Sequence, residues 1–303
     1  MRLVALTSGI GIPAGAFEGS VAAVYPRACV LALQNGAIVT LVARAVGSLP
    51  RGITLDAPPT FPFADCVAVG AGIFARGGIL RFAGSPLSVD LRNARPWRSR
   101  LTDHAIDLGK RSTREAWDVT MTVLQEDGRG ASLARLAGPP IDMLVSASRA
   151  CDIAASSDAL SRLVGLGDGA TPAGDDYLVG HFTALWSCVN GDEGRAAFVA
   201  RLGVRLKEFA ARTHRISRVY LEAAAEGEVS ERLTKLAAQV AAGATPHAVG
   251  FAAAAALDVG HSSGANGILG LLLGSAAWGP GAVAPACRIL ATKEEIIPKF
   301  RAR

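Results

Sequence analysis

A glycine-rich segment in the middle of the chain constrains the fold more than any other feature. Residues 165–180 read GLGDGATPAGDDYLVG and lie between apolar segments. Glycine permits tight turns and lets a ligand approach the backbone closely. Thr171 and Pro172 are typical of a helix start, with threonine as the N-cap and proline at the first helical position. We therefore predict a glycine-rich loop that enters a helix, with Asp175 and Asp176 in its first turn.

The start of this predicted helix has the character of a catalytic or binding site. Free N–H groups and the partial positive charge of a helix N-terminus suit an anion. We predict that Asp176 and Asp175 are catalytic. The anion-binding or substrate-binding residues predicted in the loop are Gly167, Asp168, Gly169, Thr171 and Gly174. The alternative is a structural turn whose acidic residues only favour the helix dipole, and such a turn needs one aspartate.

A second segment near the C-terminus repeats the design of the first. Residues 174–180 and 264–270 share the pattern Gly, any residue, Asp or Asn, any residue, two aliphatic residues, Gly. Two helix starts of this kind would face each other across one pocket, unless the match is due to chance in a chain rich in Gly, Ala and Leu. From this segment we predict one further catalytic residue, His261. The predicted substrate-binding residues are Ser262, Ser263, Gly264 and Asn266.

Composition limits the classes of function. Half of the 303 residues are hydrophobic, 19% are charged, and the net charge is +5. The basic clusters at 92–100 and 212–218 do not alternate with aromatic residues, so we expect no nucleic-acid partner. The positive net charge indicates either a preference for small anionic ligands or a role in keeping the protein soluble. The apolar run 268–278 is too short to span a bilayer, and the five widely spaced cysteines read as reduced thiols, so we expect a cytoplasmic protein with no membrane contact.

The residue pattern changes from strand-like to helix-like near residue 95, which predicts an α+β protein with two domains. Residues 1–95 read as a β-rich domain, a small antiparallel sheet or barrel, with a hairpin at Asn35-Gly36. Residues 96–303 read as a mainly helical domain that carries the glycine-rich motifs. The predicted strands are 28–34, 37–43, 52–55, 66–69, 78–82 and 87–91. The predicted helices are 113–125, 157–163, 173–189, 192–212, 216–225, 230–242, 245–257 and 265–278, with a partly helical tail at 292–303.

Three other chemical hypotheses follow from the motifs. Thr213 and Ser217 lie in a basic, hydroxyl-rich stretch that either binds a phosphate or carboxylate, or simply ends a helix. Adjacent aspartates on a helix point about 100° apart and cannot both face one ion. The sequence therefore does not identify a metal site. It leaves open that one of the two aspartates binds a Mg²⁺ ion that carries a phosphate-bearing ligand. Residues 260–264 match the Gly-x-Ser-x-Gly string of hydrolases, but a helical segment precedes them where that motif needs a strand.

The motifs together resemble those of a known bacterial family. Residues 165–180 are similar to the signature of the family that includes the AllH-type subunit of oxamate carbamoyltransferase. Thr213 and Ser217, followed by Leu221, Ala224 and Gly227, resemble a helix segment of that family. Residues 260–270 resemble its C-terminal motif, and residues 48–53 resemble its N-terminal turn. The resemblance spans nearly the whole chain, and the central motif is its most specific part.

The resemblance implies carbamoyl transfer between oxalurate or oxamate and phosphate in allantoin and purine breakdown, with other subunit types as partners. In that reaction Asp176 would orient the amide nitrogen or a water. The chain departs from the family pattern at Ala170, Ser262 and Asn266, and Asn266 replaces a common Asp, which removes a charge from a ligand position. The alternatives are a non-catalytic subunit or sensor for an anionic metabolite, and a free-standing amide-cleaving enzyme.

Overall fold

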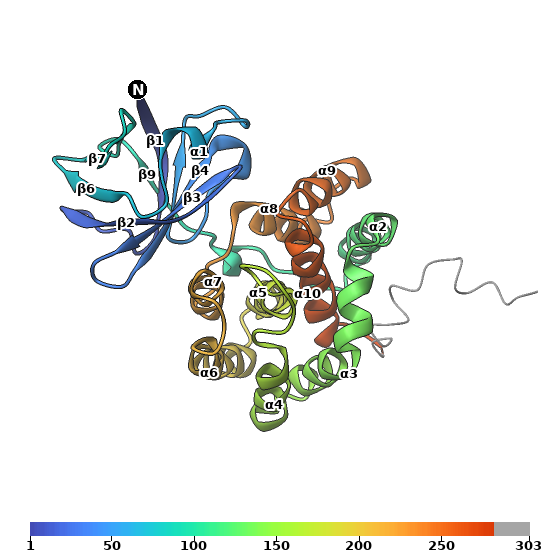
Figure 1. Cartoon of the computed structure of the whole chain (residues 1–303). Helices are drawn as coiled ribbons and strands as arrows, with labels where there is room; N and C mark the ends of the chain where they lie inside the picture. The colour runs from blue at the N-terminus through green and yellow to red at the C-terminus, as the bar shows by residue number, and fades with distance from the viewer. Residues whose placement is uncertain (282–303) are drawn as a thin grey trace, which may run out of the picture. The chain divides into compact units, whose positions relative to one another are not determined.

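The chain folds as an α+β protein, as the sequence predicts. The computed structural model describes residues 1–281. The first of its two compact units is Met1–Ser99, and the second begins at Arg100. The first unit contains the strands and the second contains the long helices (Figure 1). Each unit has its own hydrophobic core, and the two cores share no residue.

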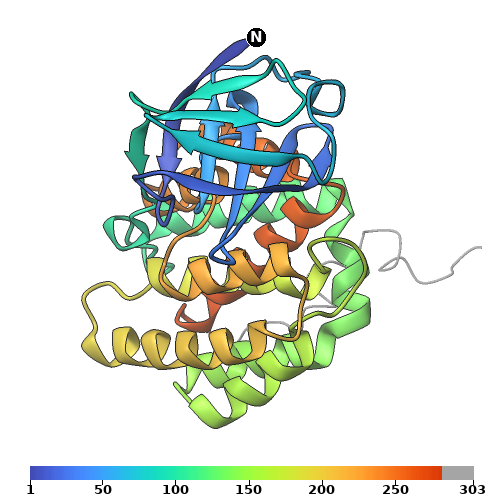
Figure 2. The ribbon, with the colours of Figure 1, turned by 60° about the vertical axis from the view of Figure 1, so that its left-hand side comes forward.

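The first unit is a nine-stranded sheet that closes on itself. The strands are β1 (Arg2–Gly9), β2 (Phe17–Tyr25), β3 (Ala28–Leu33), β4 (Ile38–Ala43), β5 (Gly52–Leu55), β6 (Gly72–Arg76), β7 (Ile79–Phe82), β8 (Ser88–Asp90) and β9 (Arg95–Trp97). Their order is β5-β4-β3-β2-β6-β7-β8-β1-β9, and an additional pairing of β5 with β1 closes a barrel, which removes the exposed edges. The strands, seen from a second direction in Figure 2, pair mostly antiparallel, but β4–β5, β1–β8 and β1–β9 are parallel.

The predicted hairpin forms where the turn residues place it. The Asn35 side chain accepts a hydrogen bond from the Ala37 amide at 3.0 Å, and Gly36 has a φ of 86°, so the turn uses the conformational freedom of glycine. The strand predicted at 66–69 is wrong. A short helix, α1 (Phe63–Cys66), ends at the first of these residues, and residues 67–69 form no strand; the Val67 amide donates to the Phe63 carbonyl oxygen. Burial of Phe63 and Val67 in the barrel core accompanies this helical turn.

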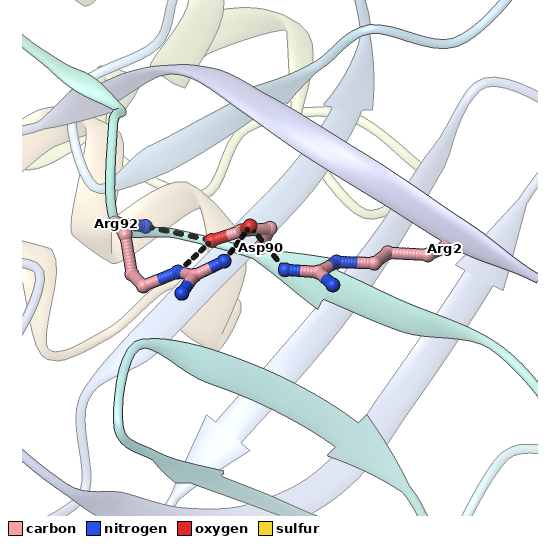
Figure 3. Close-up of polar contacts among 3 residues, drawn as sticks. All are labelled: Arg2, Asp90 and Arg92. Atoms are coloured by element: carbon pink, nitrogen blue, oxygen red, sulfur yellow. Dashed lines mark hydrogen bonds and ion pairs between the residues drawn. The ribbon is translucent and has the colours of Figure 1, made fainter.

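A carboxylate at the end of β8 joins two parts of the barrel (Figure 3). Asp90 accepts hydrogen bonds from the Arg92 side chain at 2.7 and 2.9 Å, and from Arg2 of β1 at 2.5 Å. The Arg92 hydrogen bonds hold the pKa of Asp90 well below its ordinary value, and Arg2 adds to the effect. The negative charge of Asp90 therefore persists in acid and ties β8 to β1.

The second unit consists of helices of ordinary length. They are α2 (Arg111–Asp127), α3 (Gly130–Arg149), α4 (Ile153–Leu163), α5 (Ala173–Ser187), α6 (Glu193–Ala210), α7 (Arg215–Ala225), α8 (Glu231–Ala241), α9 (Pro246–Leu257) and α10 (Ser263–Ala277). Two short 3-10 turns, η1 (Arg44–Val46) and η2 (Leu101–Asp103), lie in the first and second unit respectively. Helix α5 contacts α3, α4, α6, α7, α8 and α10, so it occupies the centre of the unit (Figure 1).

Glycines allow α5 and α10 to pack with their backbones in contact. A Cβ atom at Gly180 would overlap the carbonyl oxygen of Gly267, and a Cβ atom at Gly270 would overlap that of Tyr177. Further along, a Cβ atom at Gly274 would lie 2.7 Å from the Ala184 Cβ. Along α10, Gly267 lies near Asp176, Gly270 near Tyr177 and His181, and Gly274 near His181 and Ala184. The two helices therefore run in the same direction, and their N-termini lie at the same end.

The helices differ from the sequence expectations in two places. Helix α3 lies in a stretch for which we predict no helix, and it contains Pro139-Pro140, which disfavour a helix interior. The structure accommodates the two prolines beside a kink at Ala137, whose φ and ψ are −127° and 18°. Helix α5 begins after Pro172, and no side chain caps it. By contrast Thr245 caps α9 as expected and accepts a hydrogen bond from the Ala248 amide at 3.4 Å. The tail predicted at 292–303 lies outside the described residues.

Candidate functional site

The starts of α5 and α10 meet in the second unit. The hydroxyl groups of Thr171, just before α5, and Ser263, the first residue of α10, are hydrogen-bonded to each other at 3.1 Å. The Ser263 and Thr171 hydroxyls also interact with the carboxyl group of Asp176. Thr171 therefore contacts the second motif instead of capping its own helix. This contact brings together the two motifs that look alike in the sequence.

Asp176 is a buried carboxyl group with one unused oxygen. Its Oδ2 is buried and finds no hydrogen-bond partner within residues 1–281. The pKa of Asp176 is raised to about 7, mainly by burial and in part by the nearby charge of Asp175, while hydrogen bonds from the hydroxyls of Ser263 and Thr171 act in the opposite direction. A carboxyl group in this state exchanges a proton near neutral pH and has room for one more hydrogen-bond donor.

Asn266 supplies a second unused oxygen on the facing helix. Its side chain is 1% exposed, and no described residue donates to its Oδ1. Asn266 lies three residues after Ser263, so both residues are on the same face of α10. It occupies the position in the second motif that Asp176 occupies in the first. Buried acceptors without donors are uncommon in folded proteins. Two of them at the meeting point of two helices favour a ligand that carries N–H or O–H groups.

Asp175 differs from its neighbour because its carboxylate is fully engaged. Its Oδ1 accepts a hydrogen bond from the Gly165 amide at 2.7 Å. Its Oδ2 accepts from the Thr213 hydroxyl and from the Ser217 hydroxyl, the latter at 2.6 Å. The two predicted binding residues of the 212–217 segment are therefore turned toward Asp175. The predicted catalytic pair thus divides into one carboxylate that is saturated and one that is not.

Several predicted binding positions have a clear packing role. A Cβ atom at Gly174 would overlap the carbonyl oxygen of Leu163, and one at Gly264 would overlap that of Ala256, so both glycines allow a close helix contact. The amides of Gly174 and Gly264 donate to the carbonyl oxygens of Leu166 and Val259. These two N–H groups are therefore already used. Positive φ values mark the loop glycines Gly165, Gly167 and Gly169.

The remaining predicted residues lie at the edge of the site. Asp168 and His261 are exposed, and the His261 imidazole makes no hydrogen bond to the described part of the chain. The Ser262 carbonyl oxygen accepts from the Asn266 amide at 3.0 Å. Sequence reasoning missed Arg129, which donates to the His261 carbonyl oxygen at 2.5 Å and forms an ion pair with Asp127 at 2.7 Å. No motif surrounds Arg129 that would have marked it.

His181 on α5 belongs to the core. It is fully buried, and its ring nitrogens contact the Ser148 hydroxyl at 3.1 Å and the Tyr177 hydroxyl at 3.4 Å. Burial lowers the pKa of His181 to about 3, so the imidazole is neutral at physiological pH. This residue therefore serves the packing of α5, which agrees with the ordinary role of a histidine on an apolar helix.

The oxygen atoms of the site define what it can hold. Within the described residues, no group of three or more His, Cys, Asp and Glu side chains converges on one point. Mg²⁺ prefers oxygen ligands and often keeps several waters. Asp176 Oδ2 and Asn266 Oδ1 are the side-chain atoms that would hold such an ion together with a phosphate-bearing ligand. The same two atoms accept hydrogen bonds from an amide nitrogen equally well.

A shallow hollow of about 380 Å³ lies elsewhere, on the barrel. It is lined in part by Glu18, Gln34, Phe74 and Arg76. Glu18 forms an ion pair with Arg76 at 3.5 Å and accepts a hydrogen bond from Gln34 at 3.4 Å. Its polar side chains already satisfy one another, so we assign no ligand to it. No helix in residues 1–281 has the length and apolar character that a membrane crossing requires.

Fold and site together define an α+β protein with a barrel unit and a helical unit that carries paired helix starts. Residues 163–275, which include both motifs, match the family model described as oxamate carbamoyltransferase subunit AllH. Residues 10–96 match the model described as the AllH family N-terminal domain. The chain belongs to the AllH family. Neither the curated proteins nor the solved structures with which it was compared gave a match.

Proposed function

We propose that this chain is a carbamoyltransferase subunit whose α5–α10 site binds the amide or carbamoyl NH₂ group of its substrate. The observation that carries the proposal is the pair of buried acceptors, Asp176 Oδ2 and Asn266 Oδ1, which lack donors within the described residues. The family description, a subunit of oxamate carbamoyltransferase, supports the same chemistry. Oxamate, oxalurate and carbamoyl phosphate all end in an NH₂ group.

The match between the site and an NH₂ group is one of donors and acceptors. A primary amide nitrogen has two N–H donors and no useful acceptor. One N–H would meet Asp176 Oδ2 and the other Asn266 Oδ1. The neutral amide of Asn266 in place of a second carboxylate keeps the site from carrying two adjacent negative charges beside an anionic substrate. The Ser262 hydroxyl, just before α10, would donate to a carboxylate or phosphate oxygen of the substrate.

Asp176 can also move the proton that the transfer requires. When the oxamate nitrogen attacks the carbamoyl carbon of carbamoyl phosphate, a C–N bond forms and the C–O bond to phosphate breaks. The nitrogen must lose one proton in this step. A carboxylate whose pKa is about 7 accepts that proton at neutral pH and returns it in the reverse reaction. We further infer that other transferase subunits complete the enzyme and that it acts in the cytoplasm in allantoin and purine breakdown.

Comparison of oxamate with pyruvate tests this proposal. Pyruvate has the same charge and nearly the same shape as oxamate, but a methyl group replaces the NH₂ group. We expect calorimetry to show that the chain binds oxamate at least about tenfold more tightly than pyruvate, because the methyl group leaves two buried acceptors unpaired. Asp176→Asn should remove most of this preference. Equal affinities for the two ligands would contradict the amide site.

Activity decides between the enzyme and its alternatives. Phosphate release from carbamoyl phosphate and oxamate should require Asp176 in the complex with the partner subunits. Binding of oxamate with no Asp176-dependent activity, even in that complex, would instead identify a non-catalytic subunit or a sensor. Hydrolysis of oxalurate by the isolated chain without phosphate would identify an amide-cleaving enzyme.

A further inference from the structure

We propose that Asp175 is a positioning residue that holds the start of the glycine-rich loop and the start of α7 against α5, and that Thr213 and Ser217 act through it and not on the ligand. This inference rests on the proposed function for the identity of the ligand. It differs from the expectation that Asp175 is catalytic and that the two hydroxyl residues bind substrate.

The three donors to Asp175 come from three separate segments. Gly165 opens the loop between α4 and α5, Thr213 lies in the connection between α6 and α7, and Ser217 lies in the first turn of α7. Asp175 is 1% exposed and Ser217 is buried, whereas Thr213 is half-buried and Gly165 is exposed, so the carboxylate is shielded from water on the side of Ser217. Hydrogen bonds to a buried charged group are the strong ones, and losing one leaves a charge unpaired.

The neighbouring contacts hold the same point of the loop. A Cβ atom at Gly165 would lie 3.7 Å from the Arg212 carbonyl oxygen and 3.8 Å from the Thr213 Cβ, so the loop start already touches the α6–α7 connection. The Arg212 side chain donates to the Ser161 carbonyl oxygen near the end of α4. At the other end of the loop, the Gly174 amide donates to the Leu166 carbonyl oxygen at 2.8 Å. Residues 167–171 thus form a loop, and the contacts of Gly165 and the hydrogen bond between Gly174 and Leu166 hold its two ends in place.

Asp175 can act on the ligand only through this arrangement. Both its oxygens are occupied, whereas the next residue in the chain, Asp176, has an oxygen to offer. The bonds of Asp175 fix the rotation of the first turn of α5 and therefore the direction in which Asp176 points. They also fix where Thr171, at the far end of the loop, meets Ser263.

Hydrogen exchange of the Gly165 amide, followed by NMR in the full chain without ligand, tests the first part. Thr213→Val removes the hydroxyl but keeps the side-chain shape, and Thr213→Ser restores the hydroxyl. We expect exchange about tenfold faster in Thr213→Val and in Asp175→Asn, and wild-type exchange in Thr213→Ser and in Asp176→Asn. If Asp175→Asn does not fold, comparison of Thr213→Val with Thr213→Ser still tests whether the hydrogen bonds of Asp175 hold the start of the loop.

Ligand binding tests the second part. Thr213→Val should weaken oxamate binding about tenfold and leave the ratio of oxamate to pyruvate affinity unchanged, because the acceptors that recognise the NH₂ group remain. Asp176→Asn should show the reverse result: it should lose the preference for oxamate over pyruvate while the Gly165 amide exchanges at the wild-type rate. Unchanged exchange in Thr213→Val, or faster exchange with unchanged oxamate affinity, would overturn the positioning role. If the wild-type chain does not bind oxamate, the proposed function fails, and Gly165 exchange alone then decides whether Asp175 holds the loop.

Discussion

At the residue scale, two adjacent carboxyl groups with the same chemistry differ in hydrogen bonding because their surroundings differ. Asp175 finds three donors, while Asp176 is buried with one oxygen unpaired. Burying a charge without full compensation lowers the stability of the fold. Stability is often sacrificed in this way where a protein must bind or react. The unpaired oxygen of Asp176 is a feature that the sequence motif alone does not contain.

Asp176→Asn should stabilise the protein in a pH-dependent way. In the fold the pKa of Asp176 is raised to about 7, against an ordinary value of 3.8, so the folded protein keeps this proton longer than the unfolded chain does. The stability that depends on the proton is present below pH 4 and is lost as the pH rises through 7. The Asp176→Asn variant has no proton to lose at this position, so its stability does not fall in this way. Its advantage in the free energy of unfolding should grow by about 3 kcal/mol between pH 4.5 and pH 8.

Urea unfolding at the two pH values measures this effect. Asp175→Asn is the matched control, because it removes an acceptor that three donors use, and it should be less stable than the wild type at both pH values. An advantage of Asp176→Asn that is the same at pH 4.5 and pH 8 would show that the carboxyl group is not held in the buried state seen here.

At the element scale, the parallel packing of α5 against α10 creates the site. Glycines at the contact bring the two backbones together, and this approach places Ser263 beside Thr171 and Asp176. The glycines at this contact therefore have a packing role. Gly180 and Gly270 close the two copies of the motif, and each sits where a side chain would strike the other helix.

Gly180→Ala should destabilise the helical unit strongly. The added methyl group would overlap the Gly267 carbonyl oxygen and force α5 and α10 apart, at a loss of about 3 kcal/mol. Gly250→Ala on α9 is the matched control, because no atom lies within 4 Å of the added Cβ. There alanine should stabilise the helix by about 0.5 kcal/mol. Urea unfolding compares the two variants, and an equal effect of both would refute the close helix contact.

At the scale of the whole molecule, the chain consists of two units with separate cores. The barrel core ends at Val89 and the helical core begins at Leu101. The family models divide the chain in a similar way, with one match at 10–96 and another at 163–275. All the residues of the candidate site belong to the helical unit.

A fragment of residues 1–99 should fold without the rest of the chain. The closed barrel leaves no central strand unpaired, and its core is complete within those residues. We expect cooperative urea unfolding, followed by far-ultraviolet circular dichroism. Leu80→Ala should lower the free energy of unfolding by about 3 kcal/mol, because Leu80 is fully buried in this core. A fragment that unfolds without a cooperative transition would contradict an independent unit.

Much of the fold and part of the site could be predicted from local signals. The Asn35-Gly36 hairpin, the Ser230 cap of α8 and the change from strands to helices near residue 95 depend on neighbours in the chain, so residue type determines them. The strands β1, β2, β6 and β9 were missed, since barrel pairing stabilises them more than their own sequence does. Helix α3 contains two adjacent prolines, so tertiary packing stabilises a helix that its own sequence does not favour.

The sequence by itself determined that two similar motifs exist and that each opens a helix, because turn residues, caps and apolar periodicity act over a few residues. Only the tertiary structure decided what those motifs do. It joined Thr171 to Ser263, gave three hydrogen bonds to Asp175 and left Asp176 and Asn266 each with an unpaired oxygen. The physical reason is that burial and hydrogen-bond pairing depend on residues about 40 to 90 positions apart, and no local pattern specifies which of them will meet.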